Sequence, residues 1–256
     1  MIAAARLAAP ARGNRRCEPP LIFVHGVGST AAIWDHQLDA FGRERLCAAV
    51  ELRGNGTQKP DPDPSSITRA GYAQDVLAVA DALELEGFAL VGCSLGGAVA
   101  FELWQRAPQR IRSLLFLGAF ARYPDGERYV EQICAQAREL GNMRAFGEIR
   151  AAKLGLPPAR LRETIEQYAC KIVDCFVAAT HATWTGDYLD LLPAIDVPTL
   201  VAYGEHDAVA PRALAQQIAS GIPAAQLAMV PDAGHVANAD APEAFNALLQ
   251  SFLDRY

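Results

Sequence analysis

Residues 88–97 read Phe-Ala-Leu-Val-Gly-Cys-Ser-Leu-Gly-Gly, an apolar run that ends abruptly at a serine between two glycines. Such a stretch predicts a buried strand, a sharp turn and the start of a helix. The turn strains the serine backbone, and Gly92 and Gly96 lack the side chains that would clash where strand and helix nearly touch. A chance glycine–serine turn is the alternative. Because both flanking elements are present, we interpret Ser94 as a nucleophile held at the C-terminal end of a strand.

The segments on either side of this turn alternate between apolar runs and helical patterns. The apolar runs predict strands at residues 21–25, 46–50, 88–93, 111–117, 198–204 and 226–230. The helical patterns predict helices at residues 33–41, 68–85, 95–107, 213–220 and 242–253. Because strands joined by right-handed helical crossovers run parallel, we predict an α/β fold with a mostly parallel, doubly wound sheet.

Residues 121–192 interrupt this alternation. Helical patterns recur there at residues 128–140, 143–154 and 159–179, without a convincing strand between them. We therefore expect one domain that carries an insertion. The core is expected to comprise residues 1–120 and 193–256, and residues 121–192 a helical cap inserted after the strand that follows the nucleophile helix.

Composition restricts the class of protein and of partner. The 256 residues are 51% hydrophobic and 20% charged, and no apolar run approaches the roughly 20 residues needed to span a bilayer. The net charge of −6 argues against a nucleic-acid surface and leaves small neutral substrates as the expected partners. The first sixteen residues are basic, and we interpret them as a poorly ordered start rather than a targeting peptide, so a cytoplasmic protein is expected.

The cysteine spacing gives no sign of a metal site. Cysteines occur at positions 17, 47, 93, 134, 170 and 175. We interpret them as reduced thiols, and we expect neither a metal nor a cofactor.

A serine hydroxyl needs a base near neutral pKa and a group that orients this base. Asp207 follows the strand at residues 198–204, and His235 follows the strand at residues 226–230. The carboxyl ends of parallel strands share one edge of the sheet, so Ser94, Asp207 and His235 can converge. Glu205 and Asp232 are alternative acids. We prefer Asp207, because Glu205 is only one residue beyond its strand and Asp232 shares the loop of His235.

Hydrolysis through a tetrahedral intermediate also needs donors for a developing oxyanion. One backbone N–H is expected from the residue after the nucleophile, Leu95, and one from Val27 in the loop after the first parallel strand. His25 precedes this loop, where we expect it to brace the backbone. His36 and His206 are interpreted as surface histidines and Cys93 as a packing residue.

Together these motifs resemble the α/β-hydrolase superfamily over nearly the whole chain. The motifs are residues 25–28 (His-Gly-Val-Gly), 52–57 (Leu-Arg-Gly-Asn-Gly-Thr), 92–97, 204–207 (Gly-Glu-His-Asp) and 233–235 (Ala-Gly-His). The lead-in at residues 195–200 after a helical cap is similar to that of the small capped esterases and lactonases, including 3-oxoadipate enol-lactonase-like proteins.

The chain departs from this family at several positions. The family usually has Asp where Glu51 stands, His at Asn55 and Ser at Thr57. These changes put the hydrogen bonds of the local turn in doubt. The family also begins with two antiparallel strands, which must be short or missing here because few residues precede Leu21.

The leading functional prediction is hydrolysis of a small carboxylic ester or lactone through an acyl-enzyme on Ser94, with Asp207 and His235 completing a catalytic triad. A carbon–carbon bond hydrolase or lyase with the same triad is one alternative, and a weakly catalytic ligand receptor is another. Dehalogenase and epoxide hydrolase chemistry would require Asp at position 94.

Substrate preference is expected to come from the underside of the cap. The candidate substrate-binding residues are Phe120, Trp184, Tyr188 and Val236. Trp184 stands outside any clear helical stripe, near the point where the cap must return over the pocket. We expect this surface to favour modest, largely uncharged acyl groups or lactones.

Overall fold

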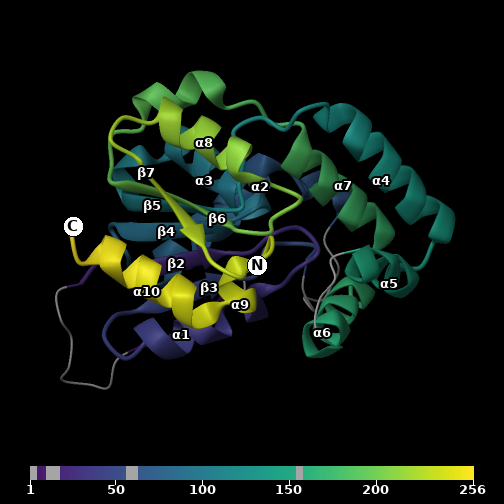
Figure 1. Ribbon diagram of the computed structural model, residues 1–256, viewed down its shortest axis with the longest axis horizontal. Coiled ribbons are helices and arrows are strands. Elements are labelled where there is room, and N and C mark those ends of the chain that lie inside the picture. Colours follow the sequence, from purple (N-terminus) through teal and green to yellow (C-terminus); the bar gives the residue numbers. More distant parts are fainter. Residues whose placement is uncertain (1–4, 10–17, 56–62, 154–157) are drawn as a thin grey trace.

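A computed structural model describes residues 5–9, 18–55, 63–153 and 158–256, and its centre is a seven-stranded sheet (Figure 1). The strand order is β1-β3-β2-β4-β5-β6-β7. The strands are β1 (Ala5–Ala8), β2 (Leu21–Val24), β3 (Cys47–Val50), β4 (Phe88–Cys93), β5 (Ile111–Leu117), β6 (Thr199–Gly204) and β7 (Gln226–Val230). Strands β2 to β7 run parallel, and β1 pairs antiparallel with β3. The predicted α/β fold with a mostly parallel sheet is thus confirmed.

Helices cover both faces of the sheet. The core helices are α1 (Asp35–Phe41), α2 (Arg69–Ala82), α3 (Leu95–Arg106), α8 (Arg212–Gly221), α9 (Ala237–Asp240) and α10 (Pro242–Leu253). Short 3₁₀ turns are η1 (Ala31–Trp34), η2 (Pro64–Ser66), η3 (Pro108–Arg110) and η4 (Leu189–Ala194). Helices α1 and α10 lie below the sheet in Figure 1, and α2, α3 and α8 lie above it.

Two apolar clusters result from the alternation of side chains along each strand. In β2, Ile22 and Val24 join the cluster under α2, α3 and α8, whereas Leu21 and Phe23 join the cluster under α1 and α10. Because successive side chains of a strand point to opposite faces, a wholly apolar strand such as β2 fits a sheet that is covered on both sides.

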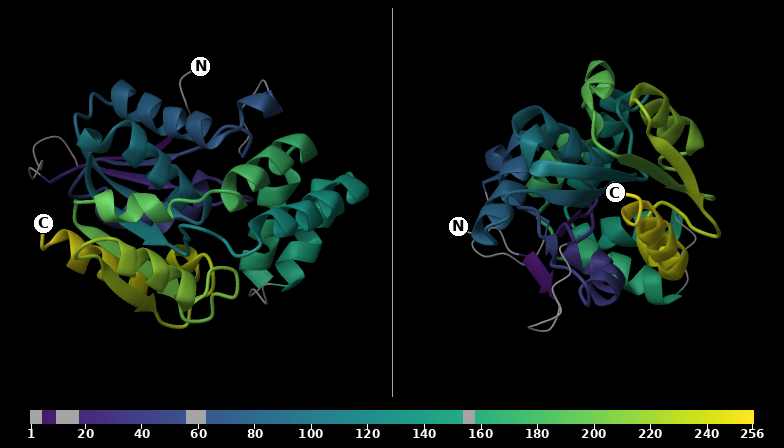
Figure 2. Two further views of the ribbon diagram at one scale, coloured as in Figure 1. Left: turned by 90° about the horizontal axis from the view of Figure 1, so that it is seen from above. Right: turned by 90° about the vertical axis from the view of Figure 1, so that its left-hand side faces the viewer.

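Residues 121–192, which we call the cap, lie at one end of the core, and their described part contains four α-helices (Figure 2). They are α4 (Gly126–Leu140), α5 (Met143–Lys153), α6 (Pro158–Ala169) and α7 (Val173–Trp184). The two chain segments that connect the cap to the core pair with each other. Arg122 and Asp187 form an antiparallel bridge, and the N–H of Tyr188 donates to the carbonyl of Ala121 at 3.0 Å.

The single helix expected at residues 159–179 is wrong, because the chain forms two helices there. The break follows α6 at Cys170 and Lys171, where Ile172 is extended (φ −94°, ψ 138°) before α7 begins. The break allows the Lys171 side chain to reach the core, as described below. Trp184, which the sequence placed outside any clear helical stripe, is the last residue of α7.

The remaining expectations concern the chain start, the cysteines and the membrane. Of the two short or missing antiparallel strands, β1 is present with four residues. The basic residues 10–16 and Cys17 lie outside the described residues. The five described cysteines are all free thiols. In the described parts of the chain, no helix has the length and apolar content that crossing a membrane requires.

Candidate active site

Ser94 occupies a strained turn between β4 and α3. Its backbone has φ 53° and ψ −110°, a region that residues with a side chain rarely adopt. A Cβ at Gly92 would lie 2.3 Å from the carbonyl oxygen of Gly96, and a Cβ at Gly96 would lie 2.3 Å from that of Val24. Only glycine fits both positions, so the two glycines allow the close approach that places Ser94 at the tip of the turn.

Asp207 and His235 meet in loops that follow β6 and β7. Nδ1 of His235 donates to Oδ2 of Asp207 at 2.8 Å, and the Asp207 side chain is fully buried. Oδ1 of Asp207 accepts the backbone N–H groups of Val209 and Ala210, each at 2.8 Å. Burial raises the pKa of Asp207, but His235 and the two amides outweigh burial and hold this pKa below its usual value. An ionised Asp207 fixes the imidazole proton on Nδ1 and leaves Nε2 free to accept a proton.

Gly118, at the end of β5, allows this pair to pack against the sheet edge. Its φ is +53°, and a Cβ there would lie 3.0 Å from the His235 carbonyl oxygen and 3.1 Å from Oδ2 of Asp207. Sequence reasoning did not single out Gly118. The available signal was a glycine directly after a strand that neighbours the nucleophile strand.

The two alternative acids lie elsewhere. Glu205 and Asp232 are exposed, and Oε2 of Glu205 accepts the Asp232 N–H at 3.1 Å. The ligand atoms of Glu205, His206 and Asp232 lie within 4.8 Å of one another, and all three residues are exposed. Surface groups of this kind are common without a metal ion.

The loop after β2 lies directly against Ser94. A Cβ at Gly26 would lie 3.2 Å from the Cβ of Ser94, and Val27 and Gly28 continue along the same cavity. Leu95 is fully buried at the N-terminus of α3, where the first backbone N–H groups have no partner within the helix. The loop after β2 and the start of α3 therefore approach Ser94 from two sides.

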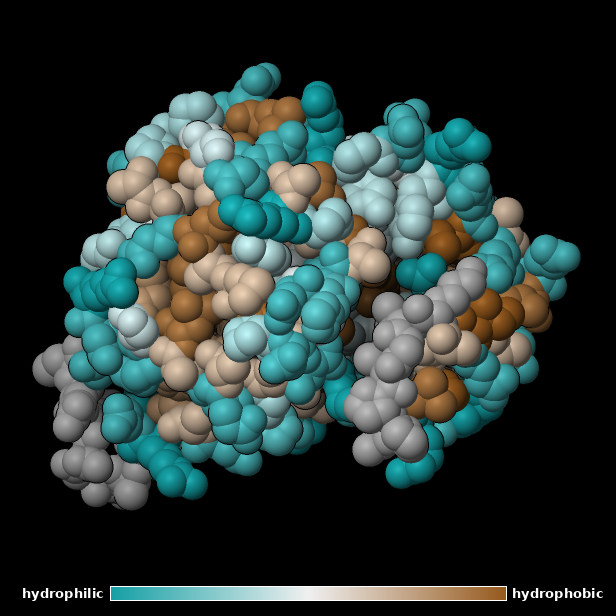
Figure 3. Space-filling model, viewed as in Figure 1, coloured by the Kyte–Doolittle hydropathy of each residue, from teal (hydrophilic) through white to brown (hydrophobic). Residues whose placement is uncertain are grey.

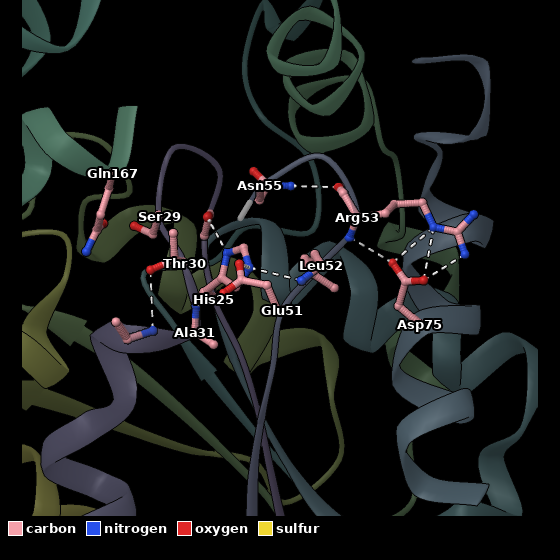
Figure 4. A network of polar contacts seen from close by, with 12 residues as sticks. His25, Ser29, Thr30, Ala31, Glu51, Leu52, Arg53, Asn55, Asp75 and Gln167 are labelled. Carbon is pink, nitrogen blue, oxygen red and sulfur yellow. Dashed lines mark hydrogen bonds and ion pairs between the residues drawn. The ribbon is translucent and has the colours of Figure 1, made fainter. Parts of the chain in front are cut away.

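His25 braces this loop from inside the core (Figure 4). Its Nδ1 donates to the Gly26 carbonyl at 2.8 Å, and its Nε2 accepts the Leu52 N–H at 3.2 Å. Oε1 of Glu51 lies 3.3 Å from the same Nε2, and Oε2 of Glu51 accepts the Ala31 N–H at 3.1 Å. Burial raises the pKa of Glu51, but the Ala31 N–H and the charge of the nearby Lys171 act against burial, and this pKa stays below its usual value.

The turn after β3 has its own hydrogen bonds despite the unusual residues there. The side chain of Arg53 forms an ion pair with Asp75 at 2.7 Å (Figure 4). The Asn55 amide donates to the Arg53 carbonyl and to the Tyr72 hydroxyl, both at 3.1 Å. Glu51 and Asn55 thus have partners in this turn, and Thr57 lies outside the described residues.

A lysine from the cap connects the two loops. Nζ of Lys171 donates to the Asn55 carbonyl at 2.6 Å and to the Ser29 carbonyl at 3.1 Å. Lys171 is buried, and burial lowers its pKa to about 8 although Glu51 nearby opposes this effect. Sequence reasoning missed this residue, because the pattern predicted an uninterrupted helix through it.

A cavity of about 150 Å³ opens between the core and the cap. Its core side includes Gly26, Val27, Ser94, Gly234, His235 and Val236, and its cap side includes Arg150, Arg160, Thr164, Gln167, Tyr168 and Trp184. The space-filling view shows a hollow between the core and the cap (Figure 3). The chain therefore brings Ser94, His235, Val27, Val236 and Trp184 to one cavity.

Two expected substrate-binding residues, Phe120 and Tyr188, are not among the residues that line this cavity. Phe120 packs against Trp184 with ring centroids 6.3 Å apart, and Tyr188 stacks on Phe101 of α3 at 4.8 Å. Trp184 has two roles, because its ring contacts Phe120, Tyr123 and Tyr129 and also faces the cavity.

The polar cap residues of the lining were not anticipated. Arg160, Thr164, Gln167 and Tyr168 recur at the spacing of one helical face, and this face of α6 points at the cavity. The signal was a polar stripe at residues 160, 164 and 167, which in isolation is typical of a solvated helix face.

Comparisons with known proteins agree with this arrangement. A model of the alpha/beta hydrolase family matches residues 21–248. The RutD protein of Azorhizobium caulinodans, named for carbamate hydrolysis, is 30% identical over 243 residues, which cover 91% of this chain and 90% of RutD. Carboxylesterase YbfK of Bacillus subtilis is 29% identical over 241 residues, which cover 92% of this chain and 80% of YbfK. The enol-lactonase structure from Burkholderia xenovorans LB400 superposes with a TM-score of 0.86 at 24% identity and covers 98% of this chain and 96% of the enol-lactonase. The resemblance to capped esterases and lactonases is thus confirmed.

Proposed function

This chain belongs to the α/β-hydrolase family and is a hydrolase, and from that premise we propose that it cleaves a small carboxylic ester or lactone with Ser94 as nucleophile. The observation that carries the proposal is the 2.8 Å hydrogen bond between Asp207 and His235 beside a cavity that both His235 and Ser94 line. A carboxylesterase and an enol-lactonase among the similar proteins support the same class of bond.

In the proposed reaction, Oγ of Ser94 forms a bond to the substrate carbonyl carbon while its proton passes to Nε2 of His235. The backbone N–H groups of Val27 and Leu95 stabilise the negative charge on the carbonyl oxygen. His235 then gives the proton to the departing alkoxide, which leaves an acyl group on Ser94. A water molecule repeats the steps, and the acid is released.

Turnover of a panel of aryl esters and lactones tests this proposal. Ser94→Ala is expected to lower kcat by about a millionfold, because the members of such a triad act as one unit. Cys170→Ala is the matched control, since it removes an exposed nucleophile that lies outside the cavity lining, and it is expected to leave kcat unchanged. If folded Ser94→Ala retains more than about a tenth of the activity, another group is the nucleophile.

The same panel discriminates the class of bond. We expect the wild-type protein to turn over esters or lactones faster than carbamates and β-diketones of matched size. Faster cleavage of a diketone would assign the triad to carbon–carbon bond hydrolysis. Stoichiometric binding with no turnover of any panel member would indicate a receptor.

A further inference from the structure

The geometry points to a subsite for a substrate carboxylate in the cap side of the cavity, with Arg150 of α5 as the residue that binds it. This inference rests on the proposed function, because the subsite lies in the cavity that Ser94 and His235 line. It replaces the expectation that the cap favours uncharged acyl groups.

The neighbours of Arg150 are phenols rather than carboxylates. Nη2 of Arg150 donates to the Tyr129 hydroxyl at 3.1 Å, and the Tyr168 phenol lies near the same guanidinium at the cavity. In the described parts of the chain, no carboxylate lies within ion-pair distance of Arg150. The Tyr129 hydroxyl accepts a hydrogen bond from the guanidinium, but neither neutral phenol neutralises its charge.

Arg150 differs from Arg160 and Arg144 of the cap, which both pair with carboxylates. Arg160 also lines the cavity, but it pairs with Glu163 and lies 3.6 Å from Oδ1 of Asp240. Arg144, six residues before Arg150 on α5, forms a two-pronged pair with exposed Glu166 at 2.7 Å. Arg150 is thus a half-buried cation that the described residues leave without a counter-charge.

An uncompensated guanidinium in such a place favours an anionic ligand. Arginine stays protonated in proteins, so it does not relieve the cost of burial by losing its proton. A ligand carboxylate offers two oxygens to its planar fork and supplies the missing charge. Among the described residues that line the cavity, Asp240 is the only carboxylate; it accepts the Gly234 N–H at 3.1 Å and lies 3.6 Å from Nε of Arg160.

The place of Arg150 in the cavity indicates which part of the substrate carries the carboxylate. Tyr168 joins the arginine to the catalytic side, because its hydroxyl abuts Gly28, with only 2.5 Å between that oxygen and the place of a Gly28 Cβ. The cavity measures about 150 Å³, which suits a short chain between the two ends. The substrate class is therefore an ester or lactone whose acyl part ends in a free carboxylate, such as a monoester of a short dicarboxylic acid.

Two nearly isosteric substrates test the subsite. Mono-p-nitrophenyl glutarate carries a terminal carboxylate, and p-nitrophenyl 5-oxohexanoate carries a neutral methyl ketone in its place. We expect the wild-type protein to favour the glutarate ester, and Arg150→Gln to lower kcat/KM for this ester by about 10- to 100-fold while the ketone ester changes less than about threefold. Arg150→Lys is expected to retain part of the preference, because it keeps the charge but not the fork.

Arg144→Gln is the matched control, since it removes a cation from the same helix outside the cavity. It is expected to leave kcat/KM for both esters unchanged. The inference is overturned if Arg150→Gln slows both esters equally, or if the wild-type protein prefers the ketone ester. If Arg150→Gln does not fold, the same comparison is made with Arg150→Lys, and an unchanged preference in that variant overturns the bidentate role of Arg150.

A binding measurement separates this inference from the proposed reaction. Calorimetric titration of glutarate into Ser94→Ala needs no turnover. We expect glutarate to bind, and to bind about 10- to 100-fold more weakly when Arg150→Gln is added to Ser94→Ala. Arginine-dependent binding without ester turnover in the wild-type protein would contradict the proposed function and retain the subsite. Ester turnover together with glutarate binding that does not depend on Arg150 would support the proposed function and contradict the subsite.

Discussion

The sheet edge and the underside of the cap build the same cavity by different means. At the sheet edge, loops that follow β2, β4, β5, β6 and β7 place the reacting groups, and tight glycine contacts hold the loops in place. On the cap, Arg150, Tyr168 and Trp184 reach the cavity as side chains of three different helices. In the proposed reaction, the chemistry depends on backbone geometry, whereas the choice of substrate depends on side chains that can change without moving the backbone.

This difference predicts unequal consequences of substitution. A change at the sheet edge should lower the rate for every substrate, because all of them use the same reacting atoms. A change on the cap should alter the rates of substrates relative to one another. The following predictions test this contrast, beginning with the largest effect.

Asp207→Asn is expected to lower kcat by roughly 10⁴-fold for all esters, because an amide at Oδ2 favours the wrong imidazole tautomer. Glu205→Gln is the control, since Glu205 follows the same strand but is exposed and contacts Asp232. Steady-state rates on three esters of different acyl length check both variants. A severe loss in Glu205→Gln with a mild loss in Asp207→Asn would show that Glu205, and not Asp207, orients His235.

Trp184→Ala is expected to reorder rates across a series of ester chain lengths by roughly 1 to 3 kcal/mol between the most and least affected member. The reason is that the indole faces the cavity, so its removal opens space for longer acyl chains. Phe120→Leu is the control, because Phe120 packs on the same indole outside the lining. A uniform loss across the series would show that Trp184 only packs the cap.

Lys171→Met is expected to change the pH dependence of stability and leave the relative rates of esters unaltered. The pKa of Lys171 is lowered from 10.5 to about 8 in the folded chain, so between these pH values the unfolded chain binds more protons. The free energy of unfolding of the wild-type protein therefore increases as the pH rises from about 8, by at most about 1.4 kcal/mol per pH unit. Below pH 8, Lys171 adds no such increase.

Urea unfolding at pH 7, 8, 9 and 10 measures this increment as the difference between the wild-type protein and Lys171→Met. The wild-type protein should gain stability relative to the variant only above about pH 8. Parallel curves over the whole range would show that folding does not lower the pKa of Lys171.

Much of the sheet edge was predictable because each of its parts has a local signal. The turn around Ser94 follows from glycine spacing, and the loops of Asp207 and His235 follow from the ends of apolar strands. The acid preferred from its distance beyond the strand is the residue that bonds to His235. Gly118 escaped notice because its reason is a contact with residues far along the chain.

The cap was less predictable because its features depend on tertiary contacts. The helix break near Lys171 follows from hydrogen bonds to Ser29 and Asn55, more than 100 residues earlier, which no local pattern contains. Arg150 lies in a helical stretch with several charged residues, where an arginine is typical of a solvated face. Only the packing of α5 against α4 and α6 places it on the cavity, where no described residue is an acidic partner.

In the proposed function, the sheet edge activates Ser94 whatever substrate the cap selects. Brief reaction with a small fluorophosphonate, followed by intact mass and peptide mapping, tests it most directly, because such a reagent labels an activated serine independently of acyl preference. We predict one phosphonyl group on Ser94 in the wild-type protein and in Arg150→Gln, much slower labelling in Asp207→Asn and none in Ser94→Ala. Labelling that persists in Ser94→Ala, or that falls on another residue in the wild-type protein, would contradict the account.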